Sequence, residues 1–315
     1  MGNIPPGVWY QEATINGVKM PQRRAEDTTE KRWENLVEPL VRKDGGICID
    51  LGCNAGFYSR KMVDRGFDVI GVEREPEFLA HARYWEEQDP KGVKIVEADI
   101  NDYDLPCASV VILAQVHYWM TPEQIKALVD KLKRKAVDVI VVGSHVPLKA
   151  SPDHPNARVH KSPCDLETLR GYFEGWDEID VESDVQHFSV LFRNPTLFVM
   201  GVNDITKEEK EETDRLYPAF EKFVITVYSP DLWEYAGDYY DYLEWRGFDA
   251  YKTMEKHVDL IFSILDEGIK EPLTLIDDCV IEGHHRLIIA RQLGIKKVVC
   301  RSREHAAIRL SVSEL

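Results

Sequence analysis

The stretch Ile47-Cys-Ile-Asp-Leu-Gly-Cys-Asn-Ala-Gly-Phe-Tyr-Ser59 is the most informative part of this sequence. An apolar run ends in the acid Asp50 and then passes through the small residues Gly52, Asn54 and Gly56 into a segment typical of a helix. Glycine adopts positive φ readily, asparagine does so better than most residues, and glycine also lets the backbone approach a ligand closely. The stretch therefore predicts a buried strand, a tight ligand-binding loop and a helix.

The acid before the loop distinguishes it from loops that bind a pyrophosphate. Those loops have the pattern GxGxxG and place the phosphates at the N-terminus of the following helix. Here the pattern is DxGxNxG, and the Asp50 carboxylate would repel a pyrophosphate. The same carboxylate suits a cationic group, such as the ammonium of an amino acid.

Two further acids follow the next apolar runs. Residues 68–73 end in Glu73, which is suited to accept hydrogen bonds from ribose hydroxyls. Residues 93–97 are followed by Asp99 and Ile100, which suit the amino group and the ring face of an adenine. Open α/β sheets bind ligands at the carboxyl ends of their strands, so we expect these side chains to lie at one edge of the sheet.

These motifs resemble those of the class I S-adenosylmethionine-dependent methyltransferases, over about residues 30–202. The resemblance implies an α/β, Rossmann-like fold with a seven-stranded sheet, in which residues 184–193 and 195–202 would form the reversed final hairpin. It also implies the cofactor S-adenosyl-L-methionine (SAM), bound by Asp50, Gly52, Asn54, Gly56, Glu73, Asp99, Ile100 and Gln115. Asn54 stands where that family usually has glycine. The alternative is a Rossmann-like domain that binds another nucleotide or none.

The fourth predicted strand ends in Gln115-Val-His-Tyr-Trp119, where the cofactor sulfonium is expected. Aromatic walls there would exclude water, and Tyr118 could contact the substrate. His117 could act as a general base toward an acceptor hydroxyl. The alternative is that His117 and Trp119 pack against the following helix, and that positioning alone promotes transfer from an already activated sulfonium.

Two flanking segments are candidates for the acceptor site. In residues 22–33, Arg24, or else Arg23 or Arg32, could pair with the methionine carboxylate or with an anionic substrate, although a solvated helix face would also explain them. The loop at residues 145–163 is rich in histidine and suits a substrate-specificity insert. Its spacing is irregular, so we predict no metal site there.

The chain changes character after about residue 205. Residues 207–212 are all charged, which predicts a solvated helix or a linker at 206–215 between a first domain at 1–205 and a second at 216–315. In the second domain, Gly283 lies between a predicted strand and a predicted helix. The helix dipole, the free amides of its first turn and Arg286 would form an anion site suited to phosphate. The neighbouring Glu282 could bind Mg²⁺ or accept a proton.

This second motif resembles the ParB/sulfiredoxin-like fold, a small α+β domain, and its Glu-Gly-His-His-Arg string is most similar to that of the free-serine kinases. The resemblance implies ATP or ADP with Mg²⁺, phosphate binding by Gly283, His284 and Arg286, and catalytic roles for Glu282 and His285. His284 replaces the catalytic cysteine of sulfiredoxin, which argues against that chemistry. The alternative is a non-catalytic nucleotide-sensing or dimerisation module.

Composition restricts the partners. The 315 residues include 39 basic and 55 acidic side chains, a net charge of −16, which disfavours nucleic acid. Scattered cysteines, an N-terminus without signal-peptide features and the lack of a long apolar run predict a cytoplasmic protein with no membrane partner. We therefore expect a methyltransferase acting on a small-molecule or glycan hydroxyl or phosphate oxygen. The second domain would phosphorylate the same acceptor or would only sense nucleotide or assemble a homodimer.

Overall fold

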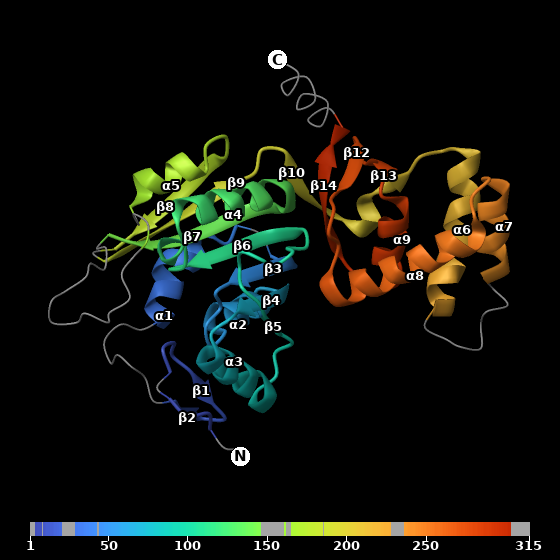
Figure 1. Cartoon of the computed structure of the whole chain (residues 1–315). Helices are drawn as coiled ribbons and strands as arrows, with labels where there is room; N and C mark the ends of the chain where they lie inside the picture. The colour runs from blue at the N-terminus through green and yellow to red at the C-terminus, as the bar shows by residue number, and fades with distance from the viewer. Residues whose placement is uncertain are drawn as a thin grey trace. The chain divides into compact units, whose positions relative to one another are not determined.

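The computed structural model describes the chain except for residues 1–3, 8, 21–28, 43, 146–160, 162–164, 185, 228–235 and 304–315, and the side chains of 225–227. The chain divides into two compact units, Met1–Pro195 and Thr196–Leu315 (Figure 1). Each unit has its own sheet and its own hydrophobic core, and each is described by itself.

The first unit is built on a seven-stranded sheet with the order β5-β4-β3-β6-β7-β9-β8. Its strands are β3 (Gly46–Leu51), β4 (Phe67–Glu73), β5 (Lys94–Glu97), β6 (Ala108–Ala114), β7 (Ala136–Ser144), β8 (Asp177–Ser183) and β9 (His187–Arg193). Strands β3 to β7 are parallel, and β9 runs antiparallel to both of its neighbours. The central strands are continuously apolar because helices cover both faces of the sheet.

Helices cover both faces of this sheet (Figure 1). Successive residues of its strands pack into the two opposite cores. Val110 and Ile112 face the layer of α2 (Phe57–Asp64) and α3 (Pro76–Gln88), whereas Val111 and Leu113 face α4 (Pro122–Lys135) and α5 (Leu166–Tyr172). The N-terminal hairpin of β1 (Thr14–Ile15) and β2 (Val18–Lys19), helix α1 (Thr29–Arg32), and the short helices Trp33–Val37 and Glu38–Leu40 complete the first layer. Each apolar strand residue is thus buried in one of two cores.

Helix α4 begins with two features that stabilise a helix N-terminus. Thr121 and Gln124 form a reciprocal capping box, and Pro122 occupies the first turn. The last turn carries three basic residues, which complement the helix dipole.

The second unit has a mixed five-stranded sheet with the order β10-β14-β12-β13-β11. Its strands are β10 (Leu197–Gly201), β11 (Thr206–Lys207), β12 (Leu273–Ile276), β13 (Cys279–Glu282) and β14 (Lys297–Ser302). The helices are α6 (Glu211–Val227), α7 (Gly237–Trp245), α8 (Ala250–Glu267), α9 (His284–Gln292) and the short helix Val202–Asp204. This unit combines helices with one sheet; its relation to the ParB/sulfiredoxin-like fold stays a prediction.

The end of the first unit differs from the sequence-based expectation. The sequence predicts residues 195–202 as the last strand of the first sheet, but β10 pairs antiparallel with β14 of the second unit. The final hairpin of the first sheet is β8–β9. Strand β8 escapes prediction because it reads Asp-Glu-Ile-Asp-Val-Glu-Ser, a polar composition tolerated at a sheet edge.

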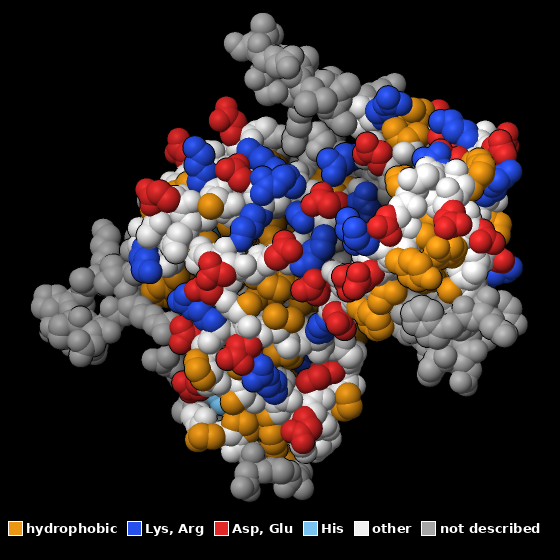
Figure 2. Space-filling model, turned by 45° about the vertical axis from the view of Figure 1, so that its right-hand side comes forward, with side chains coloured by type: hydrophobic (Ala, Val, Ile, Leu, Met, Phe, Trp, Pro, Cys, Tyr) orange, Lys and Arg blue, Asp and Glu red, His pale blue; other side chains and the backbone are white. Residues whose placement is uncertain are grey.

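The charged segment at 206–215 is not a free linker. It contains β11, which pairs in parallel with β13, and the first residues of α6. The boundary between the units falls between residues 195 and 196, earlier than the predicted 205. On the face shown in Figure 2, acidic and basic side chains are interspersed.

Candidate functional site

The loop after β3 has the backbone that its sequence predicts. Gly52, Asn54 and Gly56 adopt φ angles of 78°, 56° and 86°. The backbone N–H groups of Gly52 and Cys53 donate to the carbonyl oxygen of Val72 at 2.8 and 3.1 Å, which fixes the loop against the end of β4. Asn54 thus occupies a left-handed position that most residues would find strained.

The two glycines of this loop are needed for different reasons. A Cβ atom on Gly52 would lie 2.6 Å from Cγ2 of Val116 and 3.7 Å from Cδ1 of Ile100. A Cβ atom on Gly56 would meet no atom within 4 Å. Gly52 therefore permits close packing under the residues that follow β5 and β6, and Gly56 faces open space in the structure.

Asp50 is a buried acid, and only one of its two carboxylate oxygens accepts a hydrogen bond within the described part of the chain. Its side chain is 1% exposed, and Ser59 Oγ donates to Oδ2 at 2.7 Å. Oδ1 has no hydrogen-bond partner in the described part of the chain. Burial, with a smaller contribution from the charge of Glu73, raises the pKa of Asp50 to about 7. A buried acceptor without a donor is costly, so this oxygen suits a cationic donor from a ligand.

Glu73 connects the ends of β3 and β4. Its Oε2 accepts from the backbone N–H of Asn54 at 3.0 Å, and its Oε1 accepts from those of Arg74 and Glu75 at 2.8 and 2.9 Å. A carboxylate has about four acceptor positions. Glu73 therefore keeps room for about one hydroxyl donor, not the two ribose hydrogen bonds that the motif implies.

Asp99 is engaged by its neighbours. Asn101 donates to Oδ1 through its backbone N–H at 2.9 Å and its side chain at 2.7 Å, and Arg74 donates to Oδ2 at 2.5 Å. Burial alone would raise the pKa of Asp99, but these hydrogen bonds outweigh it and lower the pKa. Arg74, which sequence reasoning missed, therefore links Glu73 at the end of β4 to Asp99 after β5.

The residues after β6 are positioned by Arg32. Gln115 has a φ of 59°, and its Oε1 accepts from Nη1 of the buried Arg32 at 2.7 Å. Arg23 and Arg24 lie outside the described residues. Of the three candidate arginines, Arg32 is therefore the one seen to contact a predicted cofactor residue.

His117 and Tyr118 lie in the short helix His117–Trp119 and are 2% and 5% exposed. Their rings meet edge to face, with centroids 4.9 Å apart. This burial favours the packing role of His117 over a general-base role. His145, at the start of the histidine-rich segment, lies 2.9 Å from Ser183 Oγ through its Nε2, and residues 146–160 lie outside the described part.

Sequence reasoning also missed Gln11. This side chain is 6% exposed, and its Oε1 accepts from the backbone N–H of Phe57, the first residue of α2, at 3.0 Å. The two residues are 46 positions apart, so no local pattern could have indicated the contact.

The Gly283 motif forms the predicted strand–glycine–helix turn in the second unit, but Arg286 has another role. Gly283 has a φ of 98°, and a Cβ atom there would lie 2.6 Å from Leu273 Cδ2 and 2.9 Å from Arg286 Nη2. Arg286 Nη1 donates to the carbonyl oxygens of Glu271 and Pro272 at 2.5 and 3.1 Å. The guanidinium therefore fastens the segment before β12 and lies over Gly283.

The remaining motif residues also have partners within the unit. Glu282 Oε2 accepts from Thr274 Oγ1 at 2.8 Å, and His284 Nδ1 lies 3.3 Å from the Tyr217 hydroxyl. These contacts place the motif's polar side chains in hydrogen bonds of the fold.

His285 packs inside an aromatic cluster. Its ring stacks on His257 with centroids 4.2 Å apart, and the Tyr239 hydroxyl lies 2.6 Å from His257 Nδ1 and 3.1 Å from His285 Nε2. Burial lowers the pKa of His285 to about 3 and that of His257 to about 4. So weak a base is poorly suited to acid–base catalysis at neutral pH.

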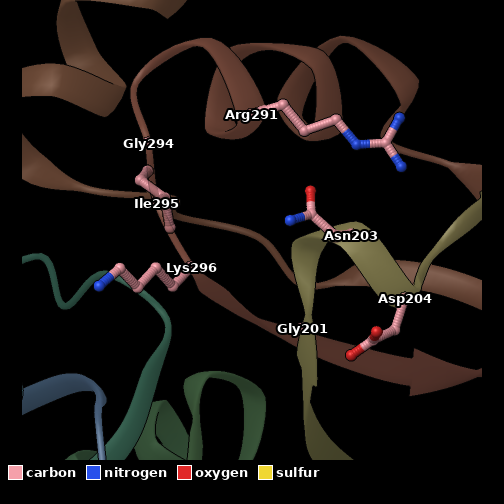
Figure 3. A pocket seen from close by; sticks show the side chains of 7 residues that line it. All are labelled: Gly201, Asn203, Asp204, Arg291, Gly294, Ile295 and Lys296. Carbon is pink, nitrogen blue, oxygen red and sulfur yellow. The ribbon is translucent and has the colours of Figure 1, made fainter.

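A cavity of about 380 Å³ lies at the opposite end of α9 (Figure 3). Its lining residues are Gly201, Asn203, Asp204, Arg291, Gly294, Ile295 and Lys296. Arg291 Nη2 donates to the carbonyl oxygens of Val202 and Ile205 at 3.3 and 2.6 Å. The cavity adjoins the C-terminal, negative end of the helix dipole, so it is not the phosphate site predicted at the N-terminal end.

The family comparison concerns the first unit. Residues 48–137, which include the loop after β3 and the acids of β4 and β5, match the family model described as methyltransferase domain. Over this segment the chain is similar to a methyltransferase domain. The seven-stranded sheet confirms the α/β, Rossmann-like methyltransferase fold predicted for this unit.

Curated relatives match parts of this chain. It is 22% identical over 163 residues to the putative methyltransferase YqeM of Bacillus subtilis, covering 50% of this chain and 65% of that protein. It is 30% identical over 105 residues to the carboxy-S-adenosyl-L-methionine synthase of Vibrio campbellii, covering 31% and 42%. The chain thus spans less than two thirds of the length of either relative.

Solved structures are similar to part of this chain at low identity. The PH0226 protein of Pyrococcus horikoshii has a TM-score of 0.46 and 17% identity, covering 52% of this chain and 90% of its own. The N-methyltransferase NodS of Bradyrhizobium japonicum, solved with S-adenosyl-L-homocysteine, has a TM-score of 0.42 and 15% identity, covering 54% and 90%. Likeness at this level says nothing of activity.

Two further properties concern the described residues alone. None of their helices is long and apolar enough to cross a bilayer. No group of three or more His, Cys, Asp or Glu side chains among them is arranged to hold a metal ion.

Proposed function

We propose that the chain is a SAM-dependent methyltransferase whose cofactor binds at the loop 50–56 and at the carboxyl ends of β4 and β5. The observation that carries the proposal is the buried Asp50, whose Oδ1 has no donor in the described part, beside a loop that is open at Gly56. Asp50 would accept the cofactor ammonium, Glu73 one ribose hydroxyl, and Ile100 would contact the adenine ring. Bound SAM supplies an activated methyl group on its sulfonium.

The acceptor that we propose is a small molecule or a glycan, methylated on a hydroxyl or phosphate oxygen. The net charge of −16 supports this choice over nucleic acid, because a polyphosphate would be repelled at long range. The buried His117 favours catalysis by positioning over catalysis by a general base. The residues after β6 would then exclude water and orient the acceptor toward the sulfonium.

Methyl-labelled SAM tests this function directly. The protein is incubated with the low-molecular-mass, nucleic-acid and protein fractions of a cell extract. We expect label in the low-molecular-mass fraction, lost in Glu73→Ala and retained in Asp68→Asn, a control acid that is exposed near the start of β4. Label confined to nucleic acid would overturn the acceptor class, and no transfer to any fraction would overturn the methyltransferase function.

For the second unit, we propose a non-catalytic nucleotide-sensing or assembly module and keep a kinase using ATP or ADP with Mg²⁺ as the second candidate. One observation favours the kinase. Gly283 precedes α9 in a left-handed conformation and provides no side-chain cap, so the backbone N–H groups of the first turn could bind a phosphate. The module is favoured because Arg286 and His285 already serve the fold.

Thermal shift and turnover separate these two roles. If the unit senses nucleotide, ATP, ADP or CTP with Mg²⁺ raises its melting temperature without being hydrolysed or transferred. Turnover that Glu282→Gln abolishes would establish the kinase instead. If no nucleotide shifts the melting temperature, the phosphate site is wrong and the turn serves packing alone.

A further inference from the structure

The N-terminal segment of the first unit reaches the cofactor loop from outside the matched methyltransferase region. Trp9 is fully buried, and its ring stacks on His81 of α3 with centroids 4.5 Å apart. Trp85 meets the same ring edge on at 6.0 Å. This packing fixes the backbone two residues before Gln11.

Gln11 in turn contacts the start of α2. Gly56 provides no side-chain cap for this helix, and Gln11 Oε1 accepts the Phe57 N–H that would otherwise be left unbonded. Because the amide oxygen faces that donor, the Nε2 group points elsewhere. Nε2 has no acceptor in the described part of the chain, and it is not among the fully buried unpartnered atoms there, so it remains accessible.

The same helical turn also contacts Asp50. Ser59, two residues after Phe57, donates to Asp50 Oδ2, while the other carboxylate oxygen has no donor in the described residues. The side chains of Gln11, with its accessible amide donor, and of Asp50, with its unbonded oxygen, therefore both contact the first turn of α2. An amino-acid group, with its ammonium and its carboxylate on one carbon, has complementary charges for this pair.

Building on the proposed function, we infer that Gln11 binds the amino-acid end of the cofactor, with Nε2 donating to the carboxylate while Oε1 holds the first amide of α2. Asp50 receives the ammonium of the same group. The N-terminal segment is thereby part of the cofactor site, although residues 48–137 alone match the methyltransferase family model.

Two ligands and two variants test this inference by calorimetry on the full chain. S-adenosyl-L-homocysteine carries the amino-acid group, and 5′-methylthioadenosine has the same adenosine and thioether without it. Gln11→Glu keeps an oxygen for the Phe57 N–H but replaces the donor with a carboxylate oxygen. The control Gln88→Glu makes the same charge change at the C-terminal end of α3. This end lies about 18 Å along the helix from its start, which follows the carboxyl end of β4.

We expect Gln11→Glu to weaken S-adenosyl-L-homocysteine binding by about tenfold or more and to leave 5′-methylthioadenosine binding within about twofold. Gln88→Glu should change neither. Equal weakening of both ligands, or weakening of neither, overturns the inference while leaving the proposed function standing. A wild type that binds neither ligand overturns the proposed function itself. If Gln11→Glu does not fold, Gln11→Met removes the donor without adding charge and provides the same comparison.

Discussion

Replacing Asp50 by Asn should stabilise the first unit at neutral and alkaline pH. Burial raises the pKa of this carboxyl from an ordinary value of 3.8 to about 7. Between these values the folded protein holds a proton that the unfolded chain has released, so the free energy of unfolding falls as pH rises through this window. About three pH units at 1.36 kcal/mol each give a destabilisation of about 4 kcal/mol, fully present above pH 7.

The Asn variant removes this charge but introduces a new cost. Ser59 can still donate to a side-chain oxygen, whereas the amide nitrogen would replace Oδ1, an atom without a hydrogen-bond partner in the described part of the chain. An unsatisfied buried N–H costs about 1–3 kcal/mol. At pH 8, Asp50→Asn should therefore raise the free energy of unfolding by about 1–3 kcal/mol, and near pH 4 it should give no gain.

Denaturant unfolding at pH 4, 6 and 8, followed by fluorescence, measures this difference. Asp68→Asn, which changes an exposed aspartate of β4, is the matched control and should show a difference near zero at every pH. The stabilised Asp50→Asn should also bind S-adenosyl-L-homocysteine about tenfold more weakly, because the ammonium loses its charged partner. A stability difference that does not change with pH would refute the assignment of a buried, raised-pKa carboxyl.

Three further outcomes are expected. Gly52→Ala should lower the free energy of unfolding by about 2 kcal/mol or more, because the residue has a positive φ and its new Cβ would lie 2.6 Å from a side chain. Gly56→Ala should lower the free energy of unfolding less but should weaken cofactor binding. Denaturation measures the first effect and calorimetry the second. Gly283→Ala should destabilise the second unit with or without nucleotide, since the Cβ would collide with protein atoms, and a purely ligand-dependent effect in thermal shift would contradict this. The pKa values of His285 and His257 are lowered from 6.5 to about 3 and about 4. Below pH 6.5 the unfolded chain therefore binds more protons than the folded chain, and the second unit should lose stability as the pH falls. Acid unfolding followed by circular dichroism measures this loss.

Short-range patterns predicted the centre of the first sheet. The run that ends in Asp50 and the run that ends in Glu73 are apolar because both faces of their strands are covered, and each acid marks a carboxyl end. The positive φ angles at Gly52, Asn54 and Gly56 follow from residue types that tolerate them. These features depend on a few consecutive residues, so a single sequence contains them.

Features set by distant partners could not be predicted in this way. Residues 197–201 are apolar enough for either sheet, and only their pairing with β14 decides between them. The polar strand β8 is tolerated because it lies at an edge. Arg286 has the residue type of a phosphate ligand, but its guanidinium donates to the backbone carbonyl oxygens of Glu271 and Pro272 instead.

Calorimetric titration of SAM into the wild type and Glu73→Ala tests the cofactor site most directly, with Asp68→Asn, which changes an exposed residue near the start of β4, as the control. Glu73 offers one remaining acceptor to a ribose hydroxyl and accepts the Asn54 backbone N–H of the loop, so we predict that the wild type binds SAM at one site. We predict a dissociation constant at least about tenfold higher for Glu73→Ala, since a charge-assisted hydrogen bond contributes about 1.5–3 kcal/mol, and an unchanged constant for Asp68→Asn. A wild type that does not bind SAM, or a Glu73→Ala variant that binds it as tightly as the wild type, would contradict the account.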